Sequence, residues 1–221
     1  MHAARALELS AGLGLSGEGA PAAVYPVAER VAEKISTLET PPDVMAVFPL
    51  PECRALTTLS GAAGEALVVF ADGIGDPGNM GTLLRAAVAF GATALATAPG
   101  SADLYGPKTV RAGMGAVFGL PLYPDVGLAD LRTALPEAAV YGLAAHEGVP
   151  LAEAALRRPA VLVVGAERPG LSSEALAYVT QFVTITLAPG LPGAVESLNA
   201  GVAGAIALYE FSRRPAAPAK G

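Results

Sequence analysis

The sequence predicts an α/β fold in which a parallel sheet is covered by helices on both faces. Five short apolar segments are rich in β-branched residues and bounded by glycine or proline, which is typical of strands buried on both faces. Segments with helical periodicity lie between them, and this alternation favours parallel strands joined by helical crossovers. The 221 residues are enough for one compact domain, or for one domain and a fragment.

The expected elements alternate through most of the chain. Strands are expected at residues 66–72, 93–99, 138–144, 160–166 and 182–188. Helices are expected at residues 79–90, 107–116, 127–135, 172–179 and 195–212. Together they predict one α/β domain at residues 59–214.

The two ends of the chain differ from this domain. Residues 1–58 contain a helical stretch, AERVAEKISTL, and a strand-like stretch, MAVFPL. We interpret them as a small separate element, joined to the rest through the Gly/Ala-rich residues 60–64. The Pro/Ala-rich tail at residues 215–221 is expected to be flexible.

Composition excludes several classes of protein. Hydrophobic residues make up 52% of the chain, but no uncharged apolar run approaches the ~20 residues of a membrane helix. The first residues lack the basic flank and apolar core of a signal peptide, so we expect a cytoplasmic protein. The single cysteine, Cys53, excludes an internal disulfide and is expected to be a small, half-buried hydrophobe.

The charge balance argues against a strongly basic nucleic-acid-binding protein. The formal net charge is -6 and the pI is near 4.9. A local basic patch can still bind RNA, and Arg85 is the strongest candidate for such a contact. The other candidates are Lys108, Arg111, Arg132, Arg157, Arg158 and Arg168.

A glycine-rich loop after the first expected strand has two interpretations. Gly73, Gly75 and Gly78 form a G-x-G-x-x-G pattern between a strand and a helix, which is the context of a dinucleotide site. Acidic residues within the loop and Pro77, which lacks an N–H, make a poor pyrophosphate cradle. The next strand also lacks the carboxylate that would bind the ribose, so a nucleotide-dependent oxidoreductase is the less favoured hypothesis.

The second interpretation starts from Asn79. We expect Asn79 to be the N-cap of the following helix and Arg85 to lie on its second turn. Six residues on a helix correspond to a rotation of roughly 240°, so the two share a site only if Arg85 reaches back along the axis. Taken alone, the pair also fits a helix cap and a solvated arginine.

Two later segments carry polar residues where expected strands end. GAERPGLSSEAL places Gly165, Glu167 and Gly170 before a helix capped by Ser172 or Ser173. Further on, Glu196, Ser197 and Asn199 lie at the start of a long helix, where free N–H groups, a hydroxyl and an amide suit a sugar or a carboxylate. Small residues from 201 to 207 would let another backbone come close, within the domain or across a subunit interface.

Hydrolase and metal chemistry have no support in the sequence. Ser197 has no plausible histidine base, because His2 is terminal and His146 lies in the surface-like HEGVP. Two distant histidines do not form a metal site either. We therefore expect no metal.

Taken together, the motifs resemble those of the SpoU (TrmH-like) family of RNA 2'-O-methyltransferases. The matching segments are, in order, DPGNMGTLLRAAVAFGA, KTVRAGMGAVFGLP, VVGAERPGLS and VESLNAGVAGAIALYE. The resemblance implies a C-terminal trefoil knot, a homodimer, S-adenosylmethionine as cofactor and methyl transfer to RNA. Knots are otherwise nearly absent from proteins, and pattern alone would not predict one.

The resemblance also implies roles for particular residues. The cofactor would be bound by Gly165, Leu198, and Ile185 or Leu187. The polar active-site residues would be Asn79, Arg85, Glu167, Ser197 and Asn199. Because a guanidinium is a poor base, we expect Arg85 to act mainly by positioning the substrate.

The chain departs from the family pattern at two glycines, in one loop and in its N-terminal residues. Gly113 and Gly201 replace serines that are common in the family, and the loop between Ile185 and Ser197 is about four residues longer than usual. Residues 1–58 resemble only the back half of an RNA-binding domain found in relatives that act on ribosomal RNA. The favoured substrate is therefore 23S ribosomal RNA, with transfer RNA as the alternative and a non-catalytic RNA-binding relative less favoured.

Overall fold

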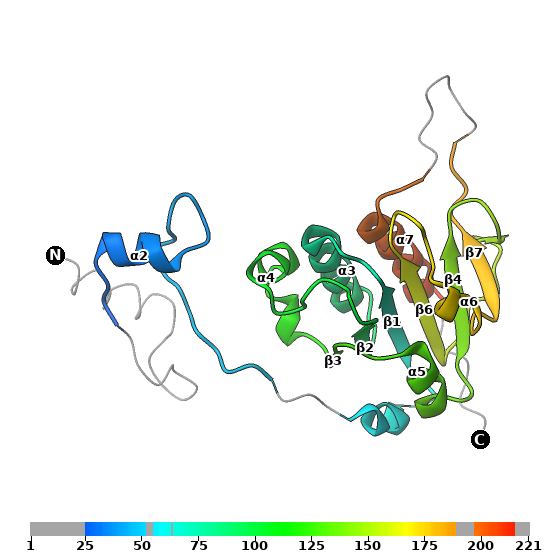
Figure 1. Ribbon diagram of the computed structural model, residues 1–221. Helices are drawn as coiled ribbons and strands as arrows, with labels where there is room; N and C mark the ends of the chain where they lie inside the picture. Colours follow the sequence, from blue (N-terminus) through cyan, green and yellow to red (C-terminus); the bar gives the residue numbers. More distant parts are fainter. Residues whose placement is uncertain (1–24, 52–54, 63, 189–196, 215–221) are drawn as a thin grey trace. The chain divides into compact units, whose positions relative to one another are not determined.

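The computed structural model of the chain describes residues 25–51, 55–62, 64–188 and 197–214 (Figure 1). Its compact units are Met1–Pro49 and Leu50–Gly221. Three sequence expectations, on Cys53, Glu196 and the tail at 215–221, lie outside the described residues. No helix in the described part is long and apolar enough to cross a membrane.

The described part of the first unit contains one helix, α2 (Glu29–Ile35), which has no buried residue. The strand expected from MAVFPL does not form, and that prediction is wrong. Val47 and Phe48 are 99% and 62% exposed, so this stretch lacks the buried face that favours a strand.

The second unit contains a sheet of seven parallel strands in the order β3-β2-β1-β6-β4-β7-β5, which confirms the predicted fold class. The five expected strands are β1 (Leu67–Asp72), β2 (Ala94–Thr97), β4 (Ala139–Ala144), β6 (Ala160–Gly165) and β7 (Gln181–Thr184). Two strands were not predicted, namely β3 (Leu122–Tyr123) and β5 (Val149–Pro150). Each has two residues, too few for a pattern.

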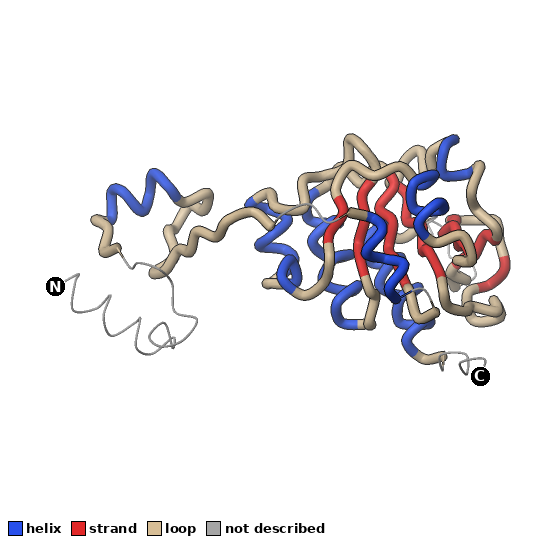
Figure 2. The backbone as a smooth tube through the Cα atoms, turned by 90° about the horizontal axis from the view of Figure 1, so that it is seen from below, coloured by secondary structure: helices blue, strands red, loops and turns tan. Residues whose placement is uncertain are grey.

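Helices lie on both faces of the sheet (Figure 2). The longest are α3 (Pro77–Ala89) and α7 (Ala200–Ser212), which pack against each other. The shorter elements are η1 (Leu56–Ala62), α4 (Pro107–Gly113), η2 (Ala116–Phe118), α5 (Leu128–Ala134) and α6 (Ser173–Leu176).

Alternate residues of β1 belong to two separate cores, because successive side chains of a strand point to opposite faces. Leu67 and Val69 pack with α3 and α7 in one core, whereas Val68 and Phe70 pack with α5 and α6 in the other. The central strands are therefore buried on both faces and carry the loops at their ends.

The Gly/Ala-rich segment expected to be a linker is partly helical. It overlaps η1, whose Leu59 is 5% exposed and belongs to the core that contains α5. The division between the compact units falls earlier, after Pro49.

Helix α3 begins earlier than expected, and the prediction that Asn79 is its N-cap is wrong. Asp76 is the N-cap, and its carboxylate accepts the Asn79 N–H at 2.8 Å. Pro77 suits the first helical position because its missing N–H would have no partner there. Asn79 therefore lies within the first turn, and its side chain does not cap the helix.

Helix α7 starts at Ala200, with Asn199 as its N-cap. It packs against α3, β6 and β4, on the opposite side of β6 from α5 and α6. The connection from β7 to α7 runs through residues 189–196, which the structure does not describe. The trefoil knot in this connection stays a prediction.

Candidate active site

The carboxyl ends of all seven strands meet at one edge of the sheet, because every strand pair is parallel. Open α/β sheets bind their ligands at this edge. A pocket of about 620 Å³, including its open mouth, lies where β4, β6 and β7 end beside the start of α7.

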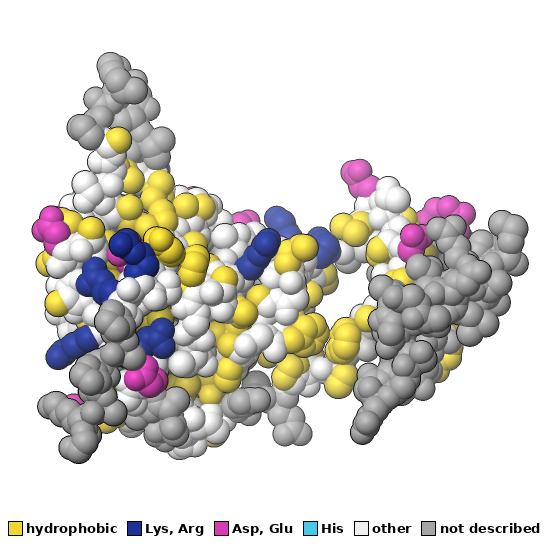
Figure 3. All heavy atoms as spheres, turned by 180° about the vertical axis from the view of Figure 1, so that it is seen from behind, with side chains coloured by type: hydrophobic (Ala, Val, Ile, Leu, Met, Phe, Trp, Pro, Cys, Tyr) yellow, Lys and Arg dark blue, Asp and Glu magenta, His cyan; other side chains and the backbone are white. Residues whose placement is uncertain are grey.

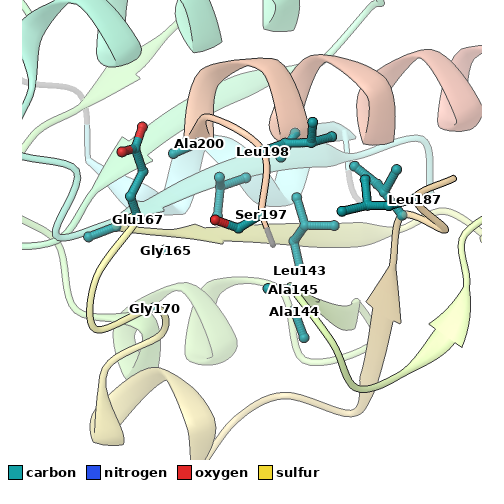
Figure 4. Close-up of a pocket in the computed structure, with 14 residues that line it drawn as sticks. Leu143, Ala144, Ala145, Gly165, Glu167, Gly170, Leu187, Ser197, Leu198 and Ala200 are labelled. Atoms are coloured by element: carbon teal, nitrogen blue, oxygen red, sulfur yellow. The ribbon is translucent and has the colours of Figure 1, made fainter. Parts of the chain in front are cut away.

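Six of the predicted site residues line this one pocket (Figure 4). They are Gly165, Glu167, Ile185, Leu187, Ser197 and Leu198. Ile185 and Leu187 both contribute, so the longer loop does not remove either of them from the wall. In Figure 4, Leu187 and Leu198 lie on one side and Glu167 on the other, which gives the pocket an apolar and a polar end.

Gly165 is required by the fold of its own loop. A Cβ atom at this position would lie 2.5 Å from the backbone C and O of Gly170. Gly170 itself has a φ of +97°, a conformation that favours glycine. The two glycines let the chain after β6 double back closely, and this turn forms one wall of the pocket.

Three predicted residues form a hydrogen-bonded polar triad of Asn79, Glu167 and Asn199. The Asn199 amide Nδ2 donates to Asn79 Oδ1 at 2.6 Å and to Glu167 Oε1 at 3.0 Å. The Asn79 amide Nδ2 donates to the same Glu167 oxygen at 3.1 Å. The triad joins α3, the loop after β6 and the start of α7.

The cap of α7 fixes the orientation of both amides. Asn199 Oδ1 accepts the N–H of Val202 at 3.2 Å, so the Asn199 Nδ2 group must face Asn79 and Glu167. Asn79 then has to present its oxygen to Asn199 and its nitrogen to Glu167. The triad therefore has one consistent donor and acceptor pattern, centred on a carboxylate.

Ser197 and Arg85 lie outside the triad. Ser197 lines the pocket two residues before Asn199, and its hydroxyl makes no hydrogen bond to a described residue. Arg85 is exposed on α3 and does not line the pocket, and its guanidinium makes no hydrogen bond or ion pair with a described residue. It lies six residues after Asn79, about 9 Å further along the helix axis.

One wall of the pocket was not predicted. Leu143, Ala144 and Ala145, at the end of β4, line it together with the predicted residues. The sequence identified their strand, but the pairing of β4 with both β6 and β7 depends on a strand order that motifs do not reveal.

The Gly73–Gly78 loop does not form a phosphate cradle. The Asp76 carboxylate occupies the start of α3, where a phosphate would bind, and accepts the N–H of Asn79 at 2.8 Å. The adjacent strand β2 ends at Thr97, so no carboxylate is present there for a ribose. The dinucleotide interpretation is therefore not supported.

Two of the basic residues considered for RNA contact have structural roles. Arg132 donates to the Ala138 carbonyl at 2.5 Å, and Arg158 donates to the carbonyls of Glu65 and Gly91 at 3.0 and 3.2 Å. No group of three or more His, Cys, Asp or Glu in the described ranges could hold a metal ion.

Comparisons with known proteins agree with the motifs. The SpoU rRNA Methylase family model matches residues 66–209. Over 196 residues the chain is 31% identical to the 23S rRNA (guanosine(2553)-2'-O)-methyltransferase RlmP of Bacillus subtilis, covering 85% of this chain and 71% of that protein.

Solved structures are also similar. A putative RNA methyltransferase of the TrmH family from Porphyromonas gingivalis aligns with a TM-score of 0.70 and 39% identity, covering 83% of this chain and 71% of that one. The SpoU methyltransferase AviRb from Streptomyces viridochromogenes, in complex with AdoMet, aligns with a TM-score of 0.62 and 28% identity, covering 73% and 64% of the two chains.

Proposed function

The chain belongs to the SpoU rRNA Methylase family, and from this premise we propose that it transfers the methyl group of S-adenosylmethionine to a ribose 2'-hydroxyl of RNA. The observation that carries the proposal is the pocket at the carboxyl edge of the sheet, with the polar triad and Ser197 beside it.

The pocket fits the chemistry of the cofactor. Leu143, Leu187 and Leu198 provide an apolar surface for an adenine ring, and the backbone at Gly165 offers polar groups at the strand end (Figure 4). When bound, S-adenosylmethionine supplies an electrophilic methyl group on a sulfonium. Holding the two reactants in line lowers the barrier by about 7–11 kcal/mol, so the residues need mainly to orient and to exclude water.

We assign the polar residues to substrate positioning. The Ser197 hydroxyl can donate to or accept from a ribose hydroxyl at the pocket. The triad fixes the start of α7, and thereby the backbone that carries Ser197 and Leu198. Arg85 provides a fixed positive charge for an RNA phosphate.

The substrate proposed is 23S ribosomal RNA, and the reaction therefore belongs in the cytoplasm. Relatives that methylate 23S rRNA support this choice, as does the resemblance of residues 1–58 to part of an RNA-binding domain. Transfer RNA is the alternative substrate.

We also propose that the protein is a homodimer built on the exposed face of α3, η2 and α7. Val88, Phe118, Val202 and Tyr209 on these packed elements are 37%, 64%, 44% and 48% exposed. Figure 3 shows hydrophobic side chains in patches beside Lys and Arg on one face of the second unit. Burial of such patches is what a self-complementary interface provides.

This interface would explain the position of Arg85. Arg85 lies three residues before Val88 and therefore on the same side of α3. In the dimer it would lie at the subunit boundary, where it can serve the pocket of the partner subunit. Each active site would then combine one protomer's pocket with the other's arginine.

The first test is binding and turnover. Calorimetric titration should give micromolar binding of S-adenosylhomocysteine and no binding of NAD. Transcripts of 23S rRNA and tRNA, incubated with radiolabelled S-adenosylmethionine, then identify the substrate class, and resistance of the product to alkaline cleavage identifies the 2'-O position. Binding of NAD alone would overturn the proposal.

The second test asks whether Arg85 acts across the interface. Arg85→Ala and Asn199→Ala protomers are coexpressed with different tags, and heterodimers are isolated by sequential purification. In a shared site each heterodimer keeps one intact pocket and should recover about half of wild-type activity. Heterodimers as inactive as the two parents would contradict the shared site, and a monomer in sedimentation would contradict the interface.

A further inference from the structure

Asp72 is a buried carboxylate that the reaction described above does not use. It is the last residue of β1 and is 5% exposed, one of three buried polar or charged residues in the described part of the chain. Burying a carboxylate is costly unless it is hydrogen-bonded. Asp72 lies beside Gly165 in the sheet, next to the pocket wall formed by the loop after β6.

Asp72 holds that loop at both of its ends. We define the cofactor loop as residues 166–171, which include the pocket residues Ala166, Glu167 and Gly170. The Asp72 carbonyl accepts the N–H of Ala166 at 3.2 Å, where the loop begins. The Asp72 carboxylate accepts the N–H of Ser172 at 2.6 Å, just after the loop ends.

We propose that Asp72 is a positioning residue that holds the cofactor loop in its binding conformation, an inference that rests on the methyltransferase function proposed above. The contact with Ala166 is made by the backbone carbonyl of Asp72, so a substitution at Asp72 does not remove its acceptor. The Ser172 contact depends on the side chain, and it is a short hydrogen bond to a charged acceptor, the stronger kind.

The geometry of the loop makes the Ser172 contact important for the pocket. The side chain of Glu167 is held by Asn79 and Asn199, near the loop's first end. Gly170, near the second end, makes a close backbone approach to Gly165. Without the carboxylate of Asp72, the second half of the loop loses this hydrogen bond and keeps the packing of Leu171 against the core that contains α5 and α6. The Gly170 wall can then move away from Gly165.

The principal test compares Asp72→Ala with Asp72→Asn. Asparagine keeps a side-chain oxygen that can accept the Ser172 N–H, whereas alanine keeps none. We expect Asp72→Ala to weaken binding of S-adenosylhomocysteine about tenfold, and Asp72→Asn to stay within about threefold of wild type. In turnover, Asp72→Ala should raise the KM for S-adenosylmethionine and leave kcat at saturating cofactor nearly unchanged.

Thr93→Ala is the matched control for general destabilisation. The Thr93 hydroxyl makes two hydrogen bonds to the backbone of Leu67, at the opposite end of the same strand. This variant should lose stability and keep wild-type cofactor affinity, with binding measured at a temperature where circular dichroism shows every variant folded. An equal loss of affinity in Thr93→Ala would overturn the positioning role.

A second pair removes the hydrogen-bond donor. Ser172 has a φ of -68°, which suits proline, so Ser172→Pro deletes the N–H at a compatible φ. Ser172→Ala keeps the N–H and loses only the α6 cap. We expect Ser172→Pro to weaken binding about as much as Asp72→Ala, and Ser172→Ala to bind nearly as wild type. This pair decides the question if Asp72→Ala does not fold.

The two proposals fail in different ways. Absence of S-adenosylhomocysteine binding by the wild-type protein would contradict the methyltransferase function. Wild-type binding together with unchanged binding by Asp72→Ala would overturn only the positioning role. Equal losses in Asp72→Asn and Asp72→Ala would also overturn it, because Asp72→Asn keeps a side-chain oxygen that can accept the Ser172 N–H.

Discussion

The loop after β1 and the loop after β6 lie at the same edge of the sheet, and both contain glycines followed by a helix, yet only the second lines the pocket. In the first loop, the Asp76 carboxylate caps α3 and occupies the place where an anion would bind, and no residue of this loop lines the pocket. In the second, Gly165 and Gly170 fold the backbone back on itself, and the chain around them borders the pocket. The G-x-G-x-x-G spacing in the first loop is therefore insufficient to predict a nucleotide site.

Exchanging single glycines for alanine provides the strongest test of this difference. A Cβ at Gly165 would lie 2.5 Å from the Gly170 backbone, whereas a Cβ at Gly75 would meet nothing within 4 Å. We expect Gly165→Ala to weaken S-adenosylhomocysteine binding about a hundredfold, equivalent to ~3 kcal/mol of overpacking.

Gly75→Ala is the control for this variant, and it should bind S-adenosylhomocysteine like the wild type. Calorimetric titration of both proteins provides the measurement. If Gly75→Ala lost affinity as well, the loop after β1 would have a part in cofactor binding that its structure does not suggest.

The sequence predicted the central sheet well for a physical reason. Strands buried on both faces are continuous apolar runs, so the main strands were recognisable without their partners. The N-cap of α3 was placed three residues late because Asp76 and Asn79 both suit this position, and Pro77 decides between them.

The polar triad shows the limit of prediction from motifs. Glu167 and Asn199 lie 88 and 120 residues from Asn79, and only the strand order brings them within hydrogen-bond distance. The motifs indicated these residues, but which amide atoms donate and which accept follows only from the hydrogen bond that caps α7. Asp72 gave no signal at all, since its partner at Ser172 is 100 residues away.

Asn199 offers a smaller and more selective test, because it has both a capping and a triad role. Asn199→Ala removes both and should lower the free energy of unfolding by about 1 kcal/mol. Asn199→Ser keeps a capping oxygen for the Val202 N–H, lacks the amide donor and places no second charge beside Glu167, so its stability should fall less. Both variants should lose methyl transfer at least about tenfold.

Urea unfolding and initial rates at saturating cofactor separate the two roles of Asn199. A serine variant with wild-type activity would mean that capping alone explains this residue. Equal destabilisation by alanine and serine would mean instead that the cap contributes little.

The smallest effect is expected at Asp76, the residue that closes the first loop. Asp76→Ala removes the cap of α3 and should cost about 1 kcal/mol, which lowers the Tm by roughly 2–4 °C. Asp76→Ser keeps a capping oxygen and should recover most of that loss in thermal unfolding. Neither variant should bind NAD, because Pro77 still lacks an N–H and β2 still ends without a carboxylate. Measurable NAD binding by Asp76→Ala would show that the Asp76 side chain alone had prevented the first loop from binding a nucleotide.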